Sequence, residues 1–418
     1  QKHDTGEAIP PYFYREILIL TAILRIAVGL SNVSEPDIRI EKIIPETGSL
    51  LIRISGSDAQ RAARRGEDAA ALWSKIFFQN VRIAPSRTGK KGTGAEELPL
   101  PGPFKAPGIE PWDPLSEAGR KVLLYNFAEM LDHEAGTRDG SDIEHLHDMR
   151  VATRRMRVAF EIFETAFVQR EIKPYIKGLR TAGKTLGRVR DRDVFLEKAE
   201  KYLEQHPEEK EGLNPLKRYW EQEREQYRQR MINYLNSQAY RGFVEDFNIF
   251  LQTPGAGAVR DQKDTPSMQV RFAAPSMLYE CLGRVRAYQR FLHSASIEQL
   301  HELRIDFKRL RYTMEYFREV LGKEAKWIIS EIKKVQDHLG DLNDADVACN
   351  ILNDFLEDFE ERQMQLPLSE RLNPEPIVAY LAVKHAERHQ LMLTFEETWA
   401  AFDRPEFMQN LAMAISVL

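Results

Sequence analysis

The sequence contains few cysteines and lacks a long uninterrupted apolar run. Its 418 residues include two cysteines, Cys281 and Cys349, and neither lies in a CxxC motif or in a cluster of Cys and His. This excludes a disulfide framework and a cysteine-based zinc site, and it is typical of proteins in a reducing compartment. The longest apolar stretch, Ile17–Leu30, is interrupted by Arg25 and is shorter than the ~20 residues that a helix needs to cross a bilayer.

Signals for secretion, membrane insertion and common catalytic sites are also lacking. No basic leader precedes an apolar stretch with a small-residue cleavage site, so we expect a cytoplasmic protein without a membrane partner. No Ser or Cys nucleophile sits beside a base, no H-E-x-x-H motif occurs, and the GKKGTG stretch lacks the residue order of a phosphate-binding loop. His385 and His389 would share a helix face but have no obvious third ligand, so we interpret them as solvated. The sequence predicts no catalytic residue, no metal site and no cofactor.

The chain has a small excess of negative charge. It carries 59 Lys and Arg residues against 64 Asp and Glu residues, which gives a formal net charge of −5. Net charge is a poor guide to anion binding when charges are segregated, because the local field is set by neighbours within about a Debye length, roughly 8–10 Å. The distribution of the basic residues along the chain therefore decides which partner the protein can bind.

The sequence divides into a short mixed region, a linker and a long helical region. Residues 1–84 combine helix-like segments, Tyr14–Leu30 and Asp58–Phe78, with strand-like alternation in Ile38–Ile44 and Leu50–Ile54, which predicts a small α+β segment. Residues 85–112 are rich in Pro, Gly and Lys and read as a linker or a long exposed loop. From Asp113 onward the pattern is helical throughout. Helix stops are expected at Gly136, Gly140, Gly212, Pro254–Gly257 and Pro367–Pro376.

The helical region contains an internal repeat. Residues 147–158 read HDMRVATRRMRV, and residues 301–312 read HELRIDFKRLRY. Farther along, LGRVRDRDV at 186–194 matches LGDLNDADV at 339–347. Two matched blocks in the same order and at nearly the same separation indicate a duplicated helical unit.

The first repeated block predicts a helix with an apolar stripe and a cationic stripe on opposite faces. The apolar stripes are Met149, Ala152, Met156, Phe160 and Phe163 in the first copy and Leu303, Phe307, Leu310, Met314 and Phe317 in the second. The cationic stripes are His147, Arg150, Arg154 and Arg157 in the first copy and His301, Arg304, Lys308 and Arg311 in the second. Like charges at this spacing destabilise a helix by roughly 0.2–0.5 kcal/mol per pair. Their presence in both copies favours a polyanion-binding face over a solvated surface or pairing with acids of a neighbouring helix.

A second row of cations follows in the first copy. Its members are Lys177, Arg180, Lys184 and Arg188. In the second copy Lys333 matches Arg180, but Asp337 replaces Lys184, so we expect the first copy to bind the anion more strongly. Arginine suits phosphate because its planar guanidinium donates two parallel hydrogen bonds. A histidine beside a polyanion is driven toward its protonated form.

Other roles for the repeated residues stay open at this point. His147 and His301 could act as general acids or bases, and four matched acids could bind a metal. These acids are Asp191, Asp193, Asp344 and Asp346. Because they follow Gly-containing segments, we favour the interpretation that they cap the next helix or orient the arginines.

The HDMRVATRRMR and HELRIDFKRLR blocks, with the LGRVRDRDV and LGDLNDADV blocks after them, resemble the CHAD domain over residues 113–418. The resemblance implies two pseudo-symmetric four-helix bundles, at 113–270 and 271–418, with a basic pore or groove between them. It implies binding of inorganic polyphosphate without catalysis, polyphosphate-metabolising enzymes as candidate partners and association with polyphosphate granules. Carried over to this chain, the binding set comprises His147, Arg150, Arg154, Arg157, Arg180, His301, Arg304, Lys308, Arg311 and Lys333, to which we add Lys177, Lys184 and Arg188 from the cationic row.

Residues 1–84 resemble a different protein. LILTAILRIAVGLSNVSEPDIRI and GSLLIRISG are similar to the C-terminal region of the exopolyphosphatase/guanosine pentaphosphate phosphohydrolase family, but the actin-like domains of that family are absent. His3 and Asp4 form a dipeptide found in metal phosphohydrolases, yet no other histidine precedes His133. We interpret this segment as an accessory unit. The alternative functions are an accessory subunit of a phosphohydrolase and a nucleic-acid-binding protein, and the cationic rows argue against the latter because they contain no aromatics for base stacking.

Overall fold

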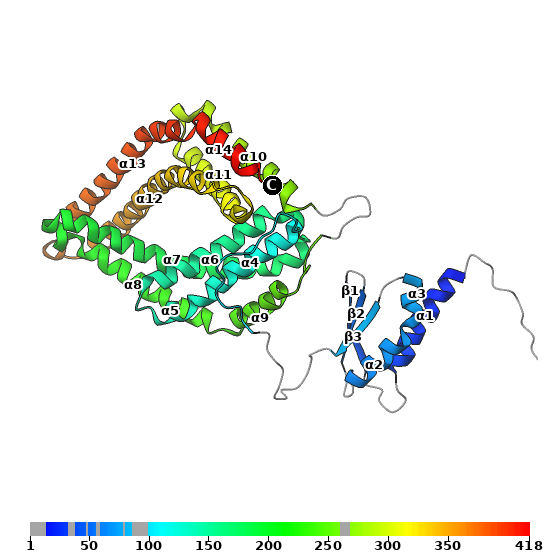
Figure 1. Cartoon of the computed structure of the whole chain (residues 1–418). Helices are drawn as coiled ribbons and strands as arrows, with labels where there is room; N and C mark the ends of the chain where they lie inside the picture. The colour runs from blue at the N-terminus through cyan, green and yellow to red at the C-terminus, as the bar shows by residue number, and fades with distance from the viewer. Residues whose placement is uncertain are drawn as a thin grey trace, which may run out of the picture. The chain divides into compact units, whose positions relative to one another are not determined.

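The computed structural model describes residues 14–31, 38–46, 49–55, 59–77, 80–85, 99–259 and 268–418 (Figure 1). The chain forms two compact units, Gln1–Glu97 and Leu98–Leu418. His3, Asp4, the GKKGTG stretch and residues 86–98 of the predicted linker lie outside the described residues. Residues 99–112 contain no helix or strand, and the Glu319 carboxylate accepts hydrogen bonds from the backbone N–H groups of Gly108 and Ile109.

The first unit is a small α+β structure, as the sequence predicts. A three-stranded sheet has the order β1-β2-β3, with β1 and β2 antiparallel and β2 and β3 parallel. The elements are α1 (Tyr14–Leu30), β1 (Arg39–Glu46), β2 (Ser49–Ser55), α2 (Ala59–Ala69), α3 (Ala71–Phe77) and β3 (Asn80–Pro85). The third strand was not predicted, because the sequence NVRIAP is short and ends at a proline. Ile83 of β3 nevertheless packs with Ile54 and Ile26 in the core of this unit.

The second unit is helical, which confirms the all-α prediction for the main domain. Its first half contains α4 (Leu115–Asp132), α5 (Glu134–Asp139), α6 (Ile143–Ile162), α7 (Gln169–Gln205), α8 (Lys210–Leu235) and α9 (Gln238–Gln252). Its second half contains α10 (Val270–Arg286), α11 (Ile297–Tyr316), α12 (Ala325–Met364), α13 (Glu375–Phe402) and α14 (Pro405–Ile415). Among the described residues of this unit, β-structure is limited to isolated bridges between Pro114 and Gln269 and between Phe167 and Ala258.

Most of the predicted helix stops coincide with helix ends. Gly140 ends α5 with a φ of 75°, and loops around Pro254–Gly257 and Pro367–Pro376 follow α9 and α12. Gly136 and Gly212 lie inside α5 and α8, so these two predictions were wrong. A Cβ at Gly136 would collide with the ring of His145, and one at Gly212 would collide with Pro376. These glycines therefore serve close packing between helices, which the sequence does not distinguish from helix termination.

The two halves contain long helices of similar length in the same order. In the first half α4, α6, α7, α8 and α9 have 18, 20, 37, 26 and 15 residues. In the second half α10, α11, α12, α13 and α14 have 17, 20, 40, 28 and 11 residues. The longest helix of each half, α7 or α12, forms a hairpin with the helix that follows it (Figure 1).

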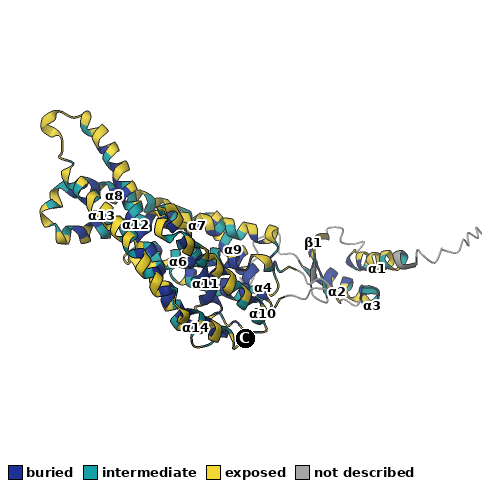
Figure 2. Ribbon diagram, turned by 90° about the horizontal axis from the view of Figure 1, so that it is seen from above, coloured by how far each residue is buried: buried dark blue, intermediate teal, exposed yellow. Residues whose placement is uncertain are grey.

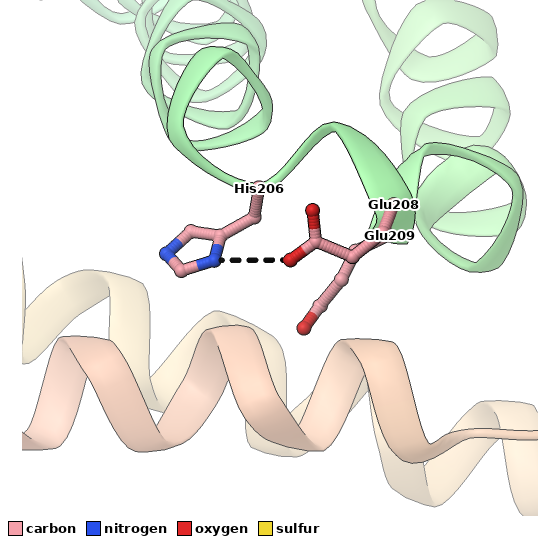
Figure 3. Close-up of side chains that lie close together, drawn as sticks. All are labelled: His206, Glu208 and Glu209. Atoms are coloured by element: carbon pink, nitrogen blue, oxygen red, sulfur yellow. Dashed lines mark ion pairs between the residues drawn. The ribbon is translucent and has the colours of Figure 1, made fainter.

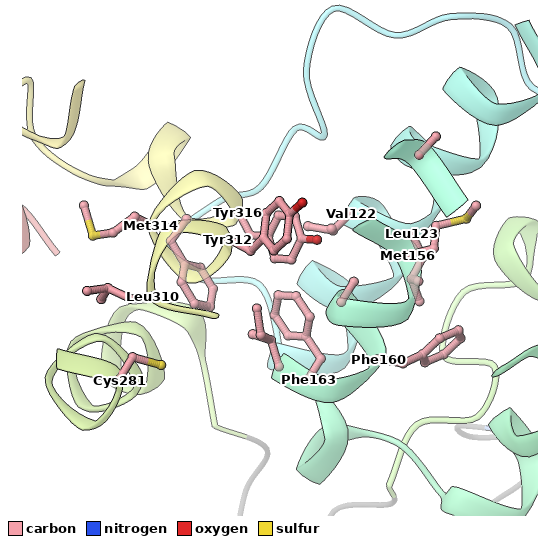
Figure 4. Packing of buried hydrophobic residues seen from close by; sticks show 14 of the residues in the cluster. Val122, Leu123, Met156, Phe160, Phe163, Cys281, Leu310, Tyr312, Met314 and Tyr316 are labelled. Carbon is pink, nitrogen blue, oxygen red and sulfur yellow. The ribbon is translucent and has the colours of Figure 1, made fainter. Parts of the chain in front are cut away.

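Both halves contribute to shared hydrophobic cores. Met156 of α6 and Phe163, which follows α6 directly, lie in one cluster with Leu310 and Tyr316 of α11 (Figure 4). A separate cluster joins the far ends of the hairpins, where Leu216 and Trp220 of α8 pack with Phe355 of α12. Figure 2 shows the buried residues of α6 and α11 in the middle of this unit and many exposed ones on its outer helices. The two halves therefore form one body, and α6 and α11 lie at its centre.

Candidate anion-binding site

Helices α6 and α11 direct their cationic stripes away from the core. The Asp142 side chain caps α6 by accepting a hydrogen bond from the N–H of Glu144, and Ser296 and Gln299 form a capping box at the start of α11. The predicted apolar stripes of both helices are buried, which confirms their orientation. Because the cationic residues lie on the opposite side of each helix, this orientation places them outside the hydrophobic core.

The cationic residues of the two copies meet around Lys308 of α11. Burial, followed by the positive charges of Arg154, Arg304, Arg150 and Arg157, lowers the pKa of Lys308 to about 7. Three of these arginines belong to α6, so side chains 150 residues apart in the sequence converge in space. We call the set His147, Arg150, Arg154, Arg157, Arg190, Arg304 and Lys308 the cationic cluster.

Carboxylates compensate only part of this charge. Burial lowers the pKa of Arg150, which the nearby Asp191 opposes, and an Asp191 oxygen lies 3.4 Å from the Arg150 Nη2. Burial likewise lowers the pKa of Arg304, and Asp344 opposes this effect. Asp344 is shared, because it also accepts a hydrogen bond of 2.9 Å from Lys198. The cations of the cluster thus outnumber the carboxylates that border it.

Several guanidinium groups of the cluster have buried N–H donors without partners. Within the described residues, the Nε atoms of Arg154 and Arg304 and both the Nε and Nη1 atoms of Arg190 make no hydrogen bond. A buried donor left unsatisfied costs about 1–3 kcal/mol. Buried donors without partners are uncommon in folded proteins, and a ligand that is rich in hydrogen-bond acceptors would satisfy these.

Two glycines let α7 approach the arginines of α6 closely. A Cβ at Gly187 would lie 3.4 Å from the Arg150 Nε, and one at Gly183 would lie 3.9 Å from an Arg157 nitrogen. Glycine at these positions therefore leaves room for the guanidinium groups between the helices. This role was not apparent from the sequence, where Gly187 is one residue of the LGRVRDRDV block.

The two histidines of the repeat differ in their surroundings. His147 is half-buried, and burial followed by the positive charge of Arg190 lowers its pKa. Without a bound anion, the imidazole of His147 is therefore more readily neutral than a free histidine. His301 is exposed, and its Nδ1 lies 2.7 Å from the Asn343 Oδ1.

Arg190 is a member of the cluster that the sequence analysis missed. It belongs to α7 and aligns with Asn343, the hydrogen-bond partner of His301. Its nearest carboxylate is that of Glu144, at 3.8 Å. The repeated block that contains Arg190 was noticed for its acidic residues. Arg190 would have been identified by considering which residue of this block lies next to His147.

The remaining predicted residues lie outside the cluster. Lys177, Arg180, Lys184 and Arg188 are exposed on α7, and Lys333 is exposed on α12. The Arg188 guanidinium lies over the ring of Tyr227, at 5.3 Å from its centroid. The cationic row itself contains no aromatic residue, but α8, which is distant in sequence, places Tyr227 beside it.

Arg311 differs from the expected uniform cationic stripe. Its Nε lies 3.2 Å from a Glu315 oxygen, and Glu315 also pairs with Arg155 of α6. The charge of Arg311 is thus partly neutralised by an acid four residues later on the same helix. The prediction of a uniformly cationic stripe on α11 left out this acidic neighbour.

The four matched acids orient basic residues and do not cap helices. All four lie within α7 or α12, which continue past the glycines that suggested helix ends. Asp193 pairs with Arg224 of α8, and Asp346 accepts a hydrogen bond of 2.7 Å from Arg388 of α13. Each pair joins a long helix to the helix that follows it. The capping alternative was wrong, and the orienting alternative agrees with these contacts.

The described residues include one group of three side chains with the proximity of metal ligands. His206, Glu208 and Glu209 lie at the turn between α7 and α8 (Figure 3). The His206 Nδ1 pairs with a Glu208 oxygen at 3.5 Å, and Tyr202 donates a hydrogen bond of 3.1 Å to Glu209. Glu208 is exposed and Glu209 is half-buried, and nothing besides this proximity points to an ion, so we assign no metal to this turn. His385 and His389 of α13 are exposed, as expected.

Comparison with known proteins supports the sequence resemblance. The sequence profile of the CHAD domain matches residues 121–353. Two solved structures are similar: "Crystal structure of the CHAD domain from the plant Ricinus communis" (19% identity, 78% of this chain and 98% of that chain, TM-score 0.47) and "PptA from Streptomyces chartreusis" (16% identity, 69% and 100%, TM-score 0.50). No curated protein matches the chain. None of the helices in the described part of the chain has the length and apolarity of a membrane span.

Proposed function

The chain belongs to the CHAD domain family, and from this premise we propose that it binds inorganic polyphosphate through the cationic cluster and is not an enzyme. The family is associated with polyphosphate binding. In this chain the proposal depends on one observation above all, the convergence of Arg150, Arg154 and Lys308 from both repeats. A linear phosphate chain would satisfy charges and donors that the protein itself leaves unsatisfied.

The energetics of the cluster favour a functional explanation. Gathering buried like charges opposes folding, because each charge loses hydration and repels its neighbours. Both effects lower the pKa of Lys308. Perturbed titratable groups of this kind are concentrated at binding and catalytic sites. Phosphate oxygens would provide charge-assisted hydrogen bonds to the free guanidinium donors, and the regular spacing of a polyphosphate would serve several arginines at once.

We extend the proposal to the architecture around the cluster. The matched helix lengths of the two halves and the equivalent pairs Asp193–Arg224 and Asp346–Arg388 support two pseudo-symmetric four-helix bundles, at 113–270 and 271–418. In this arrangement the cluster lines a basic groove between the bundles. A cytoplasmic location, association with polyphosphate granules and polyphosphate-metabolising enzymes as partners remain parts of this proposal.

Residues 1–84 have a more limited place in the proposal. The match to the CHAD profile begins at residue 121, so the likeness of the N-terminal unit to the C-terminal region of the exopolyphosphatase family stays a prediction. We propose an accessory role for this unit. Incubation of the protein with polyphosphate and Mg²⁺ or Mn²⁺ should release no phosphate, and sustained release would instead support the phosphohydrolase alternative.

Charge reversal within the cluster tests the proposed function. The double variant Arg154→Glu/Lys308→Glu should lose binding of long-chain polyphosphate, measured by isothermal titration calorimetry, and should keep the helical circular dichroism spectrum. The matched control Lys201→Glu/Arg218→Glu changes the same charge at exposed positions of α7 and α8 and should bind nearly as well as the parent. Equal affinity of parent and cluster variant would refute the proposed site.

Competition distinguishes polyphosphate from nucleic acid. Binding of both polyanions should weaken with salt through counterion release, so salt dependence alone does not separate them. Single-stranded RNA at the same phosphate concentration should displace little polyphosphate if the cluster prefers an unbranched phosphate chain. Efficient displacement would favour the nucleic-acid alternative, with Tyr227 beside Arg188 as a candidate stacking residue.

A further inference from the structure

Helices α7 and α12 carry opposite charges at matched positions of the repeat. The alignment of LGRVRDRDV with LGDLNDADV places Asp337 at the position of Lys184 and Asp341 at the position of Arg188. It also replaces Arg190 with the neutral Asn343. The core-facing positions of the same segments keep their apolar character, with Leu186 and Val189 matched by Leu339 and Leu342, all of them buried. The repeat has therefore kept its packing and changed the sign of two outer charges, whereas Lys333 keeps the positive charge of Arg180.

Both charged rows extend from the border of the cationic cluster. On α7, Asp191 contacts Arg150 of the cluster, and Lys184 lies seven residues earlier on nearly the same helix face, about 10 Å away along the axis. On α12, Asp344 acts on Arg304 and Arg150 of the cluster, and Asp337 lies at the same offset. A phosphate chain that leaves the cluster along either helix would thus meet one of these rows within about a Debye length.

The rows are available to a ligand. Among the described residues, Lys177, Arg180, Lys184 and Arg188 make no ion pair, and neither do Asp337 and Asp341, whose side chains are exposed. The acids of α12 are also close enough to act on one another. Burial raises the pKa of Asp341, Lys198 lowers it, and the negative charges of Asp344, Asp337 and Glu387 raise it.

We propose that the bound polyphosphate leaves the cationic cluster on one side only, along α7, and that Asp337 and Asp341 of α12 repel it from the other side. This inference rests on the proposed function. It assigns a polarity to the site: the cluster and the four cations of α7 hold a continuous run of phosphates, whereas the side of α12 stays free of ligand. Short anions that fill only the cluster are insensitive to both rows.

Three double variants test this polarity. Lys184→Asp/Arg188→Asp gives α7 the acids of α12, and Asp337→Lys/Asp341→Arg gives α12 the cations of α7. The control Asp354→Lys/Asp358→Arg makes the same charge change as the second variant, with the same spacing on the same helix, at exposed positions about 25 Å along the axis from Asp337. Each variant is titrated with tripolyphosphate and with long-chain polyphosphate over a series of salt concentrations.

The proposal predicts opposite effects on long chains. The α7 variant should bind long-chain polyphosphate about tenfold more weakly, and the slope of log affinity against log salt concentration should fall by about the share of two phosphate contacts. The α12 variant should bind long chains more tightly, and its slope should be steeper. The affinity for tripolyphosphate should change little in either variant, and the control should match the parent. Unchanged long-chain affinity in both the α7 and the α12 variant would overturn the proposed polarity. It would also be overturned if the control gained as much affinity as the α12 variant.

The outcome is separable from that of the proposed function. If Arg154→Glu/Lys308→Glu loses binding while the α7 and α12 variants behave like the parent, the cluster binds polyphosphate and the polarity is wrong. If the parent binds no polyphosphate at all, both the function and the polarity that depends on it are wrong.

Discussion

The two halves of the helical unit place similar helices around the cluster but differ in the charged residues that these helices carry. In the first half, Arg150 and Arg154 of α6 are joined by Arg190 of α7, and Asp193 is almost fully buried beneath its partner, with its side chain 3% exposed. In the second half, Asn343 takes the place of Arg190, and the equivalent acid, Asp346, is 24% exposed. The comparison teaches that the two halves share their apolar packing and differ in their outer charges, because the apolar positions are constrained by the core.

The largest expected effect concerns the two equivalent acid–base pairs. Removal of the almost fully buried Asp193 carboxylate breaks its ion pair with Arg224, whose side chain is 30% exposed, and should cost about 2–4 kcal/mol of unfolding free energy. Asp346 and Arg388 are each about a quarter exposed, so Asp346→Ala should cost about 1 kcal/mol or less. Urea denaturation of Asp193→Ala and Asp346→Ala measures both values.

A double variant shows whether burial explains this difference. Asp193→Leu/Arg224→Met replaces both charges by apolar groups and should recover much of the stability lost in Asp193→Ala. Equal losses in Asp193→Ala and Asp346→Ala would mean that the two halves treat these pairs alike, contrary to the comparison.

A smaller effect is expected at Lys308, the position equivalent to Arg154. Replacement by Met removes a half-buried cation among arginines and should raise the unfolding free energy by about 1–3 kcal/mol at pH 7. In the folded protein the pKa of Lys308 is about 7, below its ordinary value of 10.5, so the unfolded chain binds more protons between these values. The stability contribution of Lys308 therefore increases as pH rises from 7 to 10.5.

The pH dependence provides the measurement. The difference in unfolding free energy between Lys308→Met and the parent should be largest at neutral pH and should shrink by pH 9.5. Lys308→Arg is the matched control, because its charge persists and it should be no more stable than the parent. A constant difference across this range would show that folding does not lower the pKa of Lys308.

The sequence was sufficient to predict the features that depend on local periodicity. The apolar and cationic stripes of 147–163 and 301–317 follow from helix geometry alone, and the duplicated blocks placed Arg154 and Lys308 at equivalent positions. Convergence of these two residues was an expectation of the family resemblance, and it appears here in the lowered pKa of Lys308. These features required no knowledge of how distant helices pack.

Features that depend on contacts between distant segments could not be predicted. Arg190 joins the cluster because α7 lies against α6, and Glu315 of α11 pairs with Arg155 of α6. The helix stop expected at Gly212 fails for the same reason, because that glycine accommodates Pro376 from the other half of the chain. The sequence alone does not show which distant side chain packs against a glycine.

The smallest expected effect distinguishes two equivalent glycines, Gly187 of α7 and Gly340 of α12. Alanine inside a helix is favoured over glycine by about 1 kcal/mol. A Cβ at Gly340 would meet no atom within 4 Å, so Gly340→Ala should gain most of this stability and leave polyphosphate binding unchanged. A Cβ at Gly187 would lie 3.4 Å from the Arg150 Nε, at the limit of ordinary contact. Gly187→Ala should therefore gain less stability and bind polyphosphate a few-fold more weakly, because Arg150 must shift. Thermal denaturation and polyphosphate titration measure both effects. Identical behaviour of the two variants would show that the spacing between α6 and α7 does not set the position of Arg150.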